Sequence, residues 1–172
     1  MGLADINLQP LEDEARLQAH IEKALTIDPP AKLKSAYKFV KWAFRPHLSG
    51  TERIPDKPCL FIGNHSLFAL DGLILIPTML AEEGRFLRGM GDKFLWNSPK
   101  SSDFLLDHGT VMGHPEVCRA LMQAGKDLLV FPGGAQEAVK PVKDLYSLKW
   151  KDRYGFVRLA AEQGFTIQPF AI

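Results

Sequence analysis

The 172-residue sequence has two cysteines, a net charge of only +1 and no apolar run long enough to span a bilayer. The balanced charge gives no reason to expect a nucleic-acid partner. Cys59 and Cys118 fall in an expected core strand and an expected helix, so we expect buried free thiols of a reducing compartment. The longest apolar stretch, residues 67–80, is too short for a transmembrane helix and contains Asp71. No N-terminal segment resembles a secretion signal.

Several catalytic signatures are also missing. There is no Gly-x-Ser-x-Gly elbow, no phosphate loop, no Gly-x-Gly-x-x-Gly and no His-Glu-x-x-His. The five histidines are scattered, and the spacing of His108 and His114 is not typical of a metal site. We therefore expect neither a metal nor a cofactor. The length suits one domain with a real core, and an apolar content of 46% is ordinary for a globular protein.

A first block of interest ends in a histidine. The apolar residues 58–62 predict a short buried strand, and Gly63 and Asn64 are typical of its end. His65 should then lie at the carboxyl end of a strand, where α/β folds place their sites. A neutral imidazole can take a proton from an alcohol, and a carboxylate such as Asp71 can orient it.

The spacing limits how this pair can meet. On one continuous helix, residues six apart point about 120° apart, at roughly 100° per residue. His65 and Asp71 can therefore meet only if residues 66–70 are partly irregular, with Asp71 near the start of a helix. The alternative is an ordinary strand-end histidine followed by an aspartate N-cap.

A second block combines a predicted strand with a glycine turn. Residues 127–131 read as another buried strand, and Pro132, Gly133 and Gly134 follow in a turn where the backbone can approach a ligand closely. N–H groups exposed there could receive negative charge. A plain strand-to-helix turn explains the same residues. Glu137 lies just beyond.

Together the two blocks resemble the signature motifs of the glycerolipid acyltransferase superfamily. Its members move a fatty acyl group from a thioester to a lipid hydroxyl. Most carry His-x-x-x-x-Asp and, after a comparable separation, Phe-Pro-Glu-Gly-Thr-Arg, with which residues 131–137 align. Residues 166–170 are similar to a further family block, a strand ending at proline. The resemblance extends from about residue 58 to residue 172 and implies a general base at His65, oriented by Asp71.

Departures from the family pattern are informative. Five residues rather than four separate His65 from Asp71, and Gly-Gly-x-x-Glu replaces Glu-Gly-Thr-Arg. Both changes are similar to the branch of diacylglycerol acyltransferases and phytyl ester synthases. The arginine that binds an acceptor phosphate in other members would fall on Gln136, whose neutral side chain cannot replace it. The resemblance thus implies an uncharged lipid acceptor.

The resemblance also implies the substrate-binding residues and partners. The residues are Asn64, Phe131, Pro132, Gly133, Gly134, Glu137 and His114. His114 rests on a loose match of residues 109–114 to the family's second block, and a solvated loop histidine is the alternative. The partners would be an acyl-CoA or acyl carrier protein donor and a lipid alcohol acceptor. A thioesterase and a non-catalytic lipid-binding module on the same scaffold remain the rival functions.

Residues 1–49 are predicted as a helical segment that precedes an acyltransferase domain, residues 50–172. A first helix over residues 11–27 should end before Pro29 and Pro30. In a second helix, apolar side chains recur on one face and basic ones on an adjacent face: Leu33, Tyr37, Val40, Phe44 and Leu48, beside Lys34, Lys38, Lys41 and Arg45.

Phe39 and Trp42 project away from both of these faces. The second helix is therefore a candidate for contact with a membrane surface; a core-packed helix with solvated lysines is the alternative. We expect a peripheral or monotopic protein at the cytoplasmic face of a membrane.

The remaining elements alternate. Helices are expected at residues 72–83, 115–123 and 154–163, strands near residues 86–88, 110–112 and 166, and irregular chain at residues 96–99. This order predicts an α/β fold with a mixed, largely parallel sheet covered by helices on both faces. The resemblance implies a fold similar to that of glycerol-3-phosphate acyltransferases. Because relatives continue past the last block, we allow for a domain that is incomplete at its C-terminal end.

Overall fold

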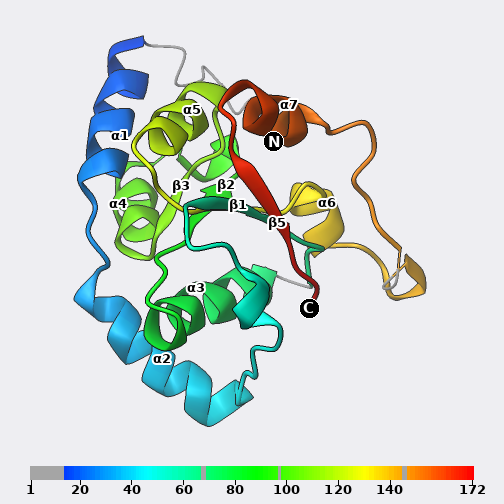
Figure 1. The fold of residues 1–172 in the computed structure, drawn as a ribbon. Coiled ribbons are helices and arrows are strands. Elements are labelled where there is room, and N and C mark those ends of the chain that lie inside the picture. Colours follow the sequence, from blue (N-terminus) through cyan, green and yellow to red (C-terminus); the bar gives the residue numbers. More distant parts are fainter. Residues whose placement is uncertain (1–13, 67–68, 97, 145–146) are drawn as a thin grey trace, which may run out of the picture.

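Five short strands form one sheet between two layers of helices (Figure 1). The computed structural model describes residues 14–66, 69–96, 98–144 and 147–172. The strand order is β3-β2-β4-β1-β5, and the pairings between the described strands are all parallel, rather than mixed. The strands are β1 (Cys59–Ile62), β2 (Arg88–Gly91), β3 (Thr110–Met112), β4 (Leu128–Val130) and β5 (Thr166–Pro169).

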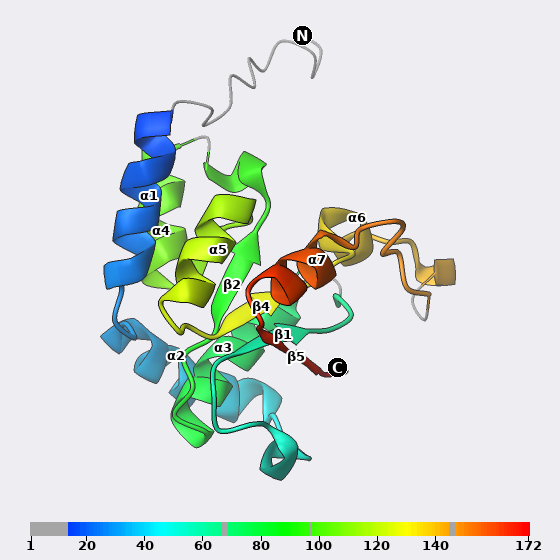
Figure 2. The same cartoon turned by 45° about the horizontal axis from the view of Figure 1, so that its top comes forward.

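Four helices cover one face of the sheet, and two cover the other (Figures 1 and 2). The first group is α1 (Glu14–Thr26), α4 (Pro99–Asp107), α5 (Pro115–Gln123) and α7 (Gly155–Glu162). The second is α2 (Ala31–Phe44) and α3 (Leu70–Glu82). The short helix α6 (Gly134–Ala138) follows β4. Single 3-10 turns span Thr51–Arg53, Lys93–Trp96 and Val142–Asp144. The predicted α/β architecture is confirmed.

The apolar runs form β1 and β4 because both faces of these strands are buried. Side chains alternate between faces of a strand. Leu60 and Leu128 accordingly pack in the core under α1, α4, α5 and α7. Phe61 and Leu129 pack in the core under α2 and α3. A buried parallel strand therefore reads as a continuous apolar run.

Asp127 fixes the start of β1 against the start of β4. Its Oδ1 accepts the Cys59 N–H at 2.8 Å, and its carboxylate pairs with Arg85 at 2.5 Å. Arg85 in turn donates to the carbonyls of Pro55 and Lys57 at 2.8 Å each. This network holds the two central strands in register at one end, so their carboxyl ends emerge together at the other.

Two local predictions differ from the structure. The second strand covers Arg88–Gly91 rather than residues 86–88. A Cβ at Gly91 would lie 3.0 Å from Thr110, so this glycine allows a close approach to β3 that strand propensity does not foresee. The chain expected to be irregular at residues 96–99 instead leads into α4, whose first residue is Pro99. Proline suits the first turn of a helix.

The N-terminal helix is attached to the sheet through His20. Its buried Nε2 accepts the Met112 N–H on the edge strand β3 at 3.1 Å, and its ring lies edge-on to Trp96 at 4.6 Å. Burial lowers the pKa of His20 to about 4. Residues 11–13 of the predicted first helix lie outside the described residues. The division between residues 1–49 and 50–172 stays a prediction.

None of the helices in the described part of the chain is long and apolar enough to cross a membrane.

The buried imidazole of His20 makes stability depend on pH. Its folded pKa of about 4 lies below the ordinary value of 6.5, so folding favours its neutral form. Its contribution to stability is then complete above pH 6.5 and declines as pH falls towards 4, by a total of about 3 kcal/mol. In His20→Gln, the amide oxygen can still accept the Met112 N–H but does not titrate. Urea unfolding at pH 7.5 and pH 5 should show a smaller loss for the variant. Equal losses in the two proteins would contradict this role.

Candidate active site

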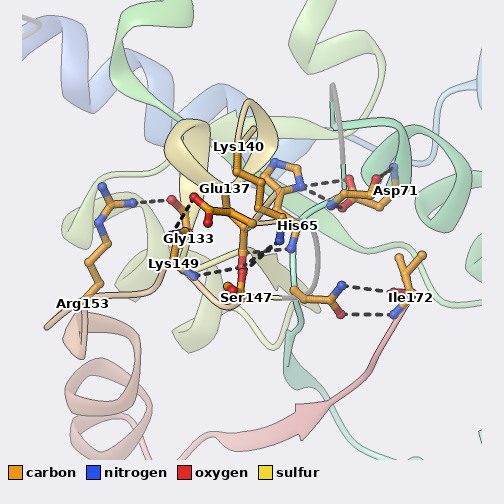
Figure 3. Close-up of polar contacts among 12 residues, drawn as sticks. His65, Asp71, Gly133, Glu137, Lys140, Ser147, Lys149, Arg153 and Ile172 are labelled. Carbon is orange, nitrogen blue, oxygen red and sulfur yellow. Dashed lines mark hydrogen bonds and ion pairs between the residues drawn. The ribbon is translucent and has the colours of Figure 1, made fainter. Parts of the chain in front are cut away.

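The parallel strands β1 and β4 are neighbours, and both end on the same side of the sheet, with Ile62 paired to Val130. The two sequence blocks that follow these strands therefore begin next to each other. His65 Nδ1 lies 2.8 Å from Asp71 Oδ2 and 3.0 Å from Oδ1 (Figure 3). The structure therefore brings together the two residues expected to form a catalytic pair.

Asp71 is held by the chain on both sides of it. Its carboxylate accepts the N–H groups of Ser66 and Gly72, and its own N–H donates to Ser66 Oγ at 3.3 Å. The residue is 2% exposed and lies in the first turn of α3, where the helix dipole favours an anion. Ala69, with φ of 57°, precedes this helix. Residues 63–66 are non-helical, as the spacing requires, while residues 67–68 lie outside the described chain.

The imidazole of His65 contacts this carboxylate through Nδ1 and an aromatic ring through one of its faces. It stacks on Phe131 with ring centroids 4.2 Å apart and planes 7° apart. Phe131 meets Phe170 edge-on at 5.8 Å. With Asp71 accepting from Nδ1–H, Nε2 keeps its lone pair and has no partner among the described residues. The site can thus accept a proton at Nε2.

Polar backbone groups of the glycine turn after β4 already form hydrogen bonds within the protein. Gly134, with φ of 55°, donates its N–H to the Phe131 carbonyl at 2.9 Å. Arg153 donates to the carbonyls of Pro132 at 3.1 Å and Gly133 at 2.8 Å. These contacts favour a structural use of the turn over direct binding of substrate charge.

Two clefts adjoin the His65–Asp71 pair. The larger, of about 1020 Å³, is lined mainly by apolar side chains and reaches Ser66 and Asp71. The smaller, of about 760 Å³, is lined by His65, Asn64 and Lys140 among others. Both include Ser66, Leu70 and residues 169–172 in their walls. The pair therefore stands where two separate spaces meet.

Among the residues expected to bind substrate, Asn64 lines the smaller cleft. Its amide is already engaged, since it accepts the Ile172 N–H at 3.2 Å and donates to the Ile172 carbonyl at 3.1 Å. Residues 131–134 and Glu137 line neither cleft. Phe131 instead stacks on the His65 ring, and Glu137 accepts the His65 N–H. Glu137 has no exposed surface.

His114 is the one candidate that the structure separates from the others. His114 follows β3, whereas His65 follows β1, and β2 and β4 lie between these two strands. Three strand spacings of about 4.8 Å place the two histidines roughly 14 Å apart. The Nδ1 atom of His114 accepts the Glu116 N–H at 3.2 Å as the N-cap of α5. In the structure its ring caps a helix, and the contact with an acceptor stays a prediction.

Three residues at the site are not predicted as site residues by the sequence. Ser66 carries a usable signal, because a hydroxyl before a helix is typical of a cap. Phe170 and Lys140 carry none, since their contacts with residues 131 and 137 depend on the fold. In the described residues, no group of three or more His, Cys, Asp or Glu side chains is placed to hold a metal ion.

An α/β fold with a carboxylate-oriented histidine at the junction of two clefts is suited to acid–base chemistry on two substrates. The family model described as Acyltransferase matches residues 45–172. The chain belongs to this family.

Curated relatives agree with the branch inferred from the motifs. The chain is 30% identical over 122 residues to a Gallus gallus protein named "DGAT1/2-independent enzyme synthesizing storage lipids". It is 33% identical over 130 residues to phytyl ester synthase 1, chloroplastic, of Arabidopsis thaliana. These matches cover 71% and 72% of the chain but 36% and 18% of the respective relatives, so it spans a minor part of their length. No solved structure gives a significant match.

Proposed function

We propose that this chain transfers a fatty acyl group from a thioester to a lipid hydroxyl, with His65 as the general base. The observation that carries the proposal is the buried Asp71 carboxylate on His65 Nδ1, which leaves Nε2 able to accept a proton. Membership of the acyltransferase family and the names of the relatives support acyl transfer in general.

The chemistry then needs only these side chains. The acceptor hydroxyl gives its proton to His65 Nε2 while its oxygen attacks the thioester carbonyl. Asp71 stabilises the imidazolium that forms and keeps the ring in the productive tautomer. As the tetrahedral intermediate collapses, the thiolate leaves and takes the proton from His65, so an ester and a thiol are released. No acyl-enzyme is needed, because the thioester is already activated.

The two clefts suit two substrates. Hydrocarbon is best accommodated by the larger one, whose walls include Phe44, Leu48 and Met79. Its volume is at the upper end of the roughly 300–1,000 Å³ of typical ligand pockets. The smaller cleft, which contains His65, would take the second substrate. The donor, whether acyl-CoA or acyl carrier protein, is left open by this assignment.

An uncharged acceptor is the better fit. Gln136 is exposed and lines neither cleft, and the cations Lys140 and Arg153 on either side of the glycine turn already have protein partners. Lys140 lies 3.8 Å from the Glu137 carboxylate, and Arg153 is directed at two carbonyls. Relatives named for phytyl esters and storage lipids point the same way.

The general base is tested by His65→Ala. Its loss should lower turnover by about 10²–10⁴-fold, the usual contribution of a positioned base. His108→Ala is a matched control, because His108 lies in the walls of neither cleft and contacts the carbonyl and ring of the neighbouring Phe104. Products from labelled acyl-CoA and a mixed lipid extract would be separated by mass spectrometry. Wild-type rates in a folded His65→Ala protein would rule out this mechanism. Free acid alone from the wild type would favour a thioesterase, and no product a lipid-binding module.

The acceptor is tested by side-by-side rates on lysophosphatidate, a diacylglycerol and a long-chain alcohol. We expect the uncharged acceptors to be preferred. A single charge-assisted contact to phosphate contributes about 1.5–3 kcal/mol, so its absence should cost lysophosphatidate roughly 10–150-fold. A clear preference for lysophosphatidate would show that Lys140 or Arg153 turns to the phosphate when substrate binds.

Attachment to a membrane surface is proposed for α2. Leu33 and Val40 are buried against the core, whereas Phe39 and Trp42 are 60% and 77% exposed. Lys34 and Lys38 are exposed on the same helix. A helix that exposes aromatic and basic side chains together is typical of an interfacial segment. The cytoplasmic face of a membrane stays a prediction.

Replacing Lys34, Lys38, Lys41 and Arg45 by Gln should weaken sedimentation with anionic liposomes. Each charge at the lipid surface contributes about 1 kcal/mol. A control with the same net charge replaces four exposed residues elsewhere: Lys57, Lys143, Lys151 and Arg158. If both variants bind equally well at low salt, α2 is not the lipid-facing element.

A further inference from the structure

Besides Asp71, the site has a second fully buried carboxylate, that of Glu137. The residue has no exposed surface and comes from α6, directly after the glycine turn. A carboxylate is taken out of water only where hydrogen bonds and an opposite charge replace its hydration. The hydrogen-bond donors and the cation around the Glu137 carboxylate therefore show which segments of the chain this side chain connects.

Glu137 connects three segments (Figure 3). Its Oε2 accepts the His65 N–H at 2.9 Å, and its Oε1 accepts the Lys149 N–H at 3.2 Å. Lys140 lies 3.8 Å from Oε1 and donates to the Ser147 carbonyl at 3.1 Å. His65, Lys140 and Ser147 all line the smaller cleft. One carboxylate thus holds the candidate base and the facing wall of that cleft.

Gly133 is required by the same carboxylate. Its φ of −65° is open to any residue, so its conformation does not demand glycine. A Cβ at this position would instead collide with the Glu137 side chain. Glycine at 133 and glutamate at 137 therefore form a structural pair. The family pattern Phe-Pro-Glu-Gly has a carboxylate at position 133, whereas here the space beside that position is occupied by a carboxylate from four residues further on.

We propose that Glu137 is a positioning residue, with Lys140 as its counter-charge. Through the N–H of Lys149, it fixes the backbone of His65 relative to Ser147 and Leu148 in the wall of the smaller cleft. The proposal rests on the proposed function of His65. Glu137 lines neither cleft, so it acts through His65 and not on substrate. The N–H groups of His65 and Lys149 are far apart in the chain, and this carboxylate is the group that joins them.

The test is Glu137→Gln, with Glu162→Gln on the exposed part of α7 as a matched control. The amide of this variant would offer a single acceptor oxygen for two N–H groups. Amide hydrogen exchange should then quicken by about tenfold or more at both His65 and Lys149, with Leu129 in the core unchanged. The ¹⁵N signals of the His65 ring should show a loss of its single tautomer. Turnover should fall by about 10²-fold with little change in KM for the donor.

Should Glu137→Gln fail to fold, the double variant with Lys140→Met removes the buried ammonium that has lost its counter-charge and serves in its place. Unchanged exchange at His65 and Lys149 would overturn the proposal. So would faster exchange with wild-type ring signals and turnover, which would leave Glu137 a purely structural role. If the wild type shows no acyl transfer, the proposed function fails, but exchange and ring signals still decide whether Glu137 positions His65.

Discussion

Parallel pairing of β1 with β4 is the constraint on which the site depends. These two strands are about seventy residues apart in the sequence, but their carboxyl ends lie side by side because Ile62 is paired with Val130. The Asp127–Arg85 network sets this register from the opposite ends of the strands. A slip of one residue would turn Phe61 towards the wrong layer of helices and separate His65 from Phe131. Core packing and site geometry are thus fixed by the same pairing.

Local pattern is enough to predict much of this arrangement. Strands buried on both faces give continuous apolar runs, so the sequence predicts β1 and β4 near their observed bounds. The six-residue spacing of His65 and Asp71 requires a break before the helix, and residues 63–66 are non-helical. The sequence does not predict α4, because a serine and proline that signal a loop also suit a helix start.

The motifs predict that Phe131 and Glu137 belong to the site, but the sequence does not predict how they contact His65. Phe131 stacks on its ring, the Glu137 carboxylate accepts its N–H, and Phe170 packs against Phe131. These contacts come from segments far along the chain, so no local spacing encodes them. The glycine turn resembles a ligand-binding element, yet its carbonyls face Arg153, and the glutamate that follows it faces backbone N–H groups. In this variant of the motif, polar groups of the turn and of Glu137 are hydrogen-bonded within the protein, and the predicted binding of substrate by these residues stays a prediction.

Residues 169–172 separate the two clefts and belong to the walls of both. Phe170 also touches Phe131, against which the His65 ring is stacked. An occupant that displaces Phe170 on one side must therefore alter the free energy of binding on the other, and the effect is reciprocal. Donor and acceptor would not bind independently, and the stiffness of this shared partition would set the size and sign of their cooperativity.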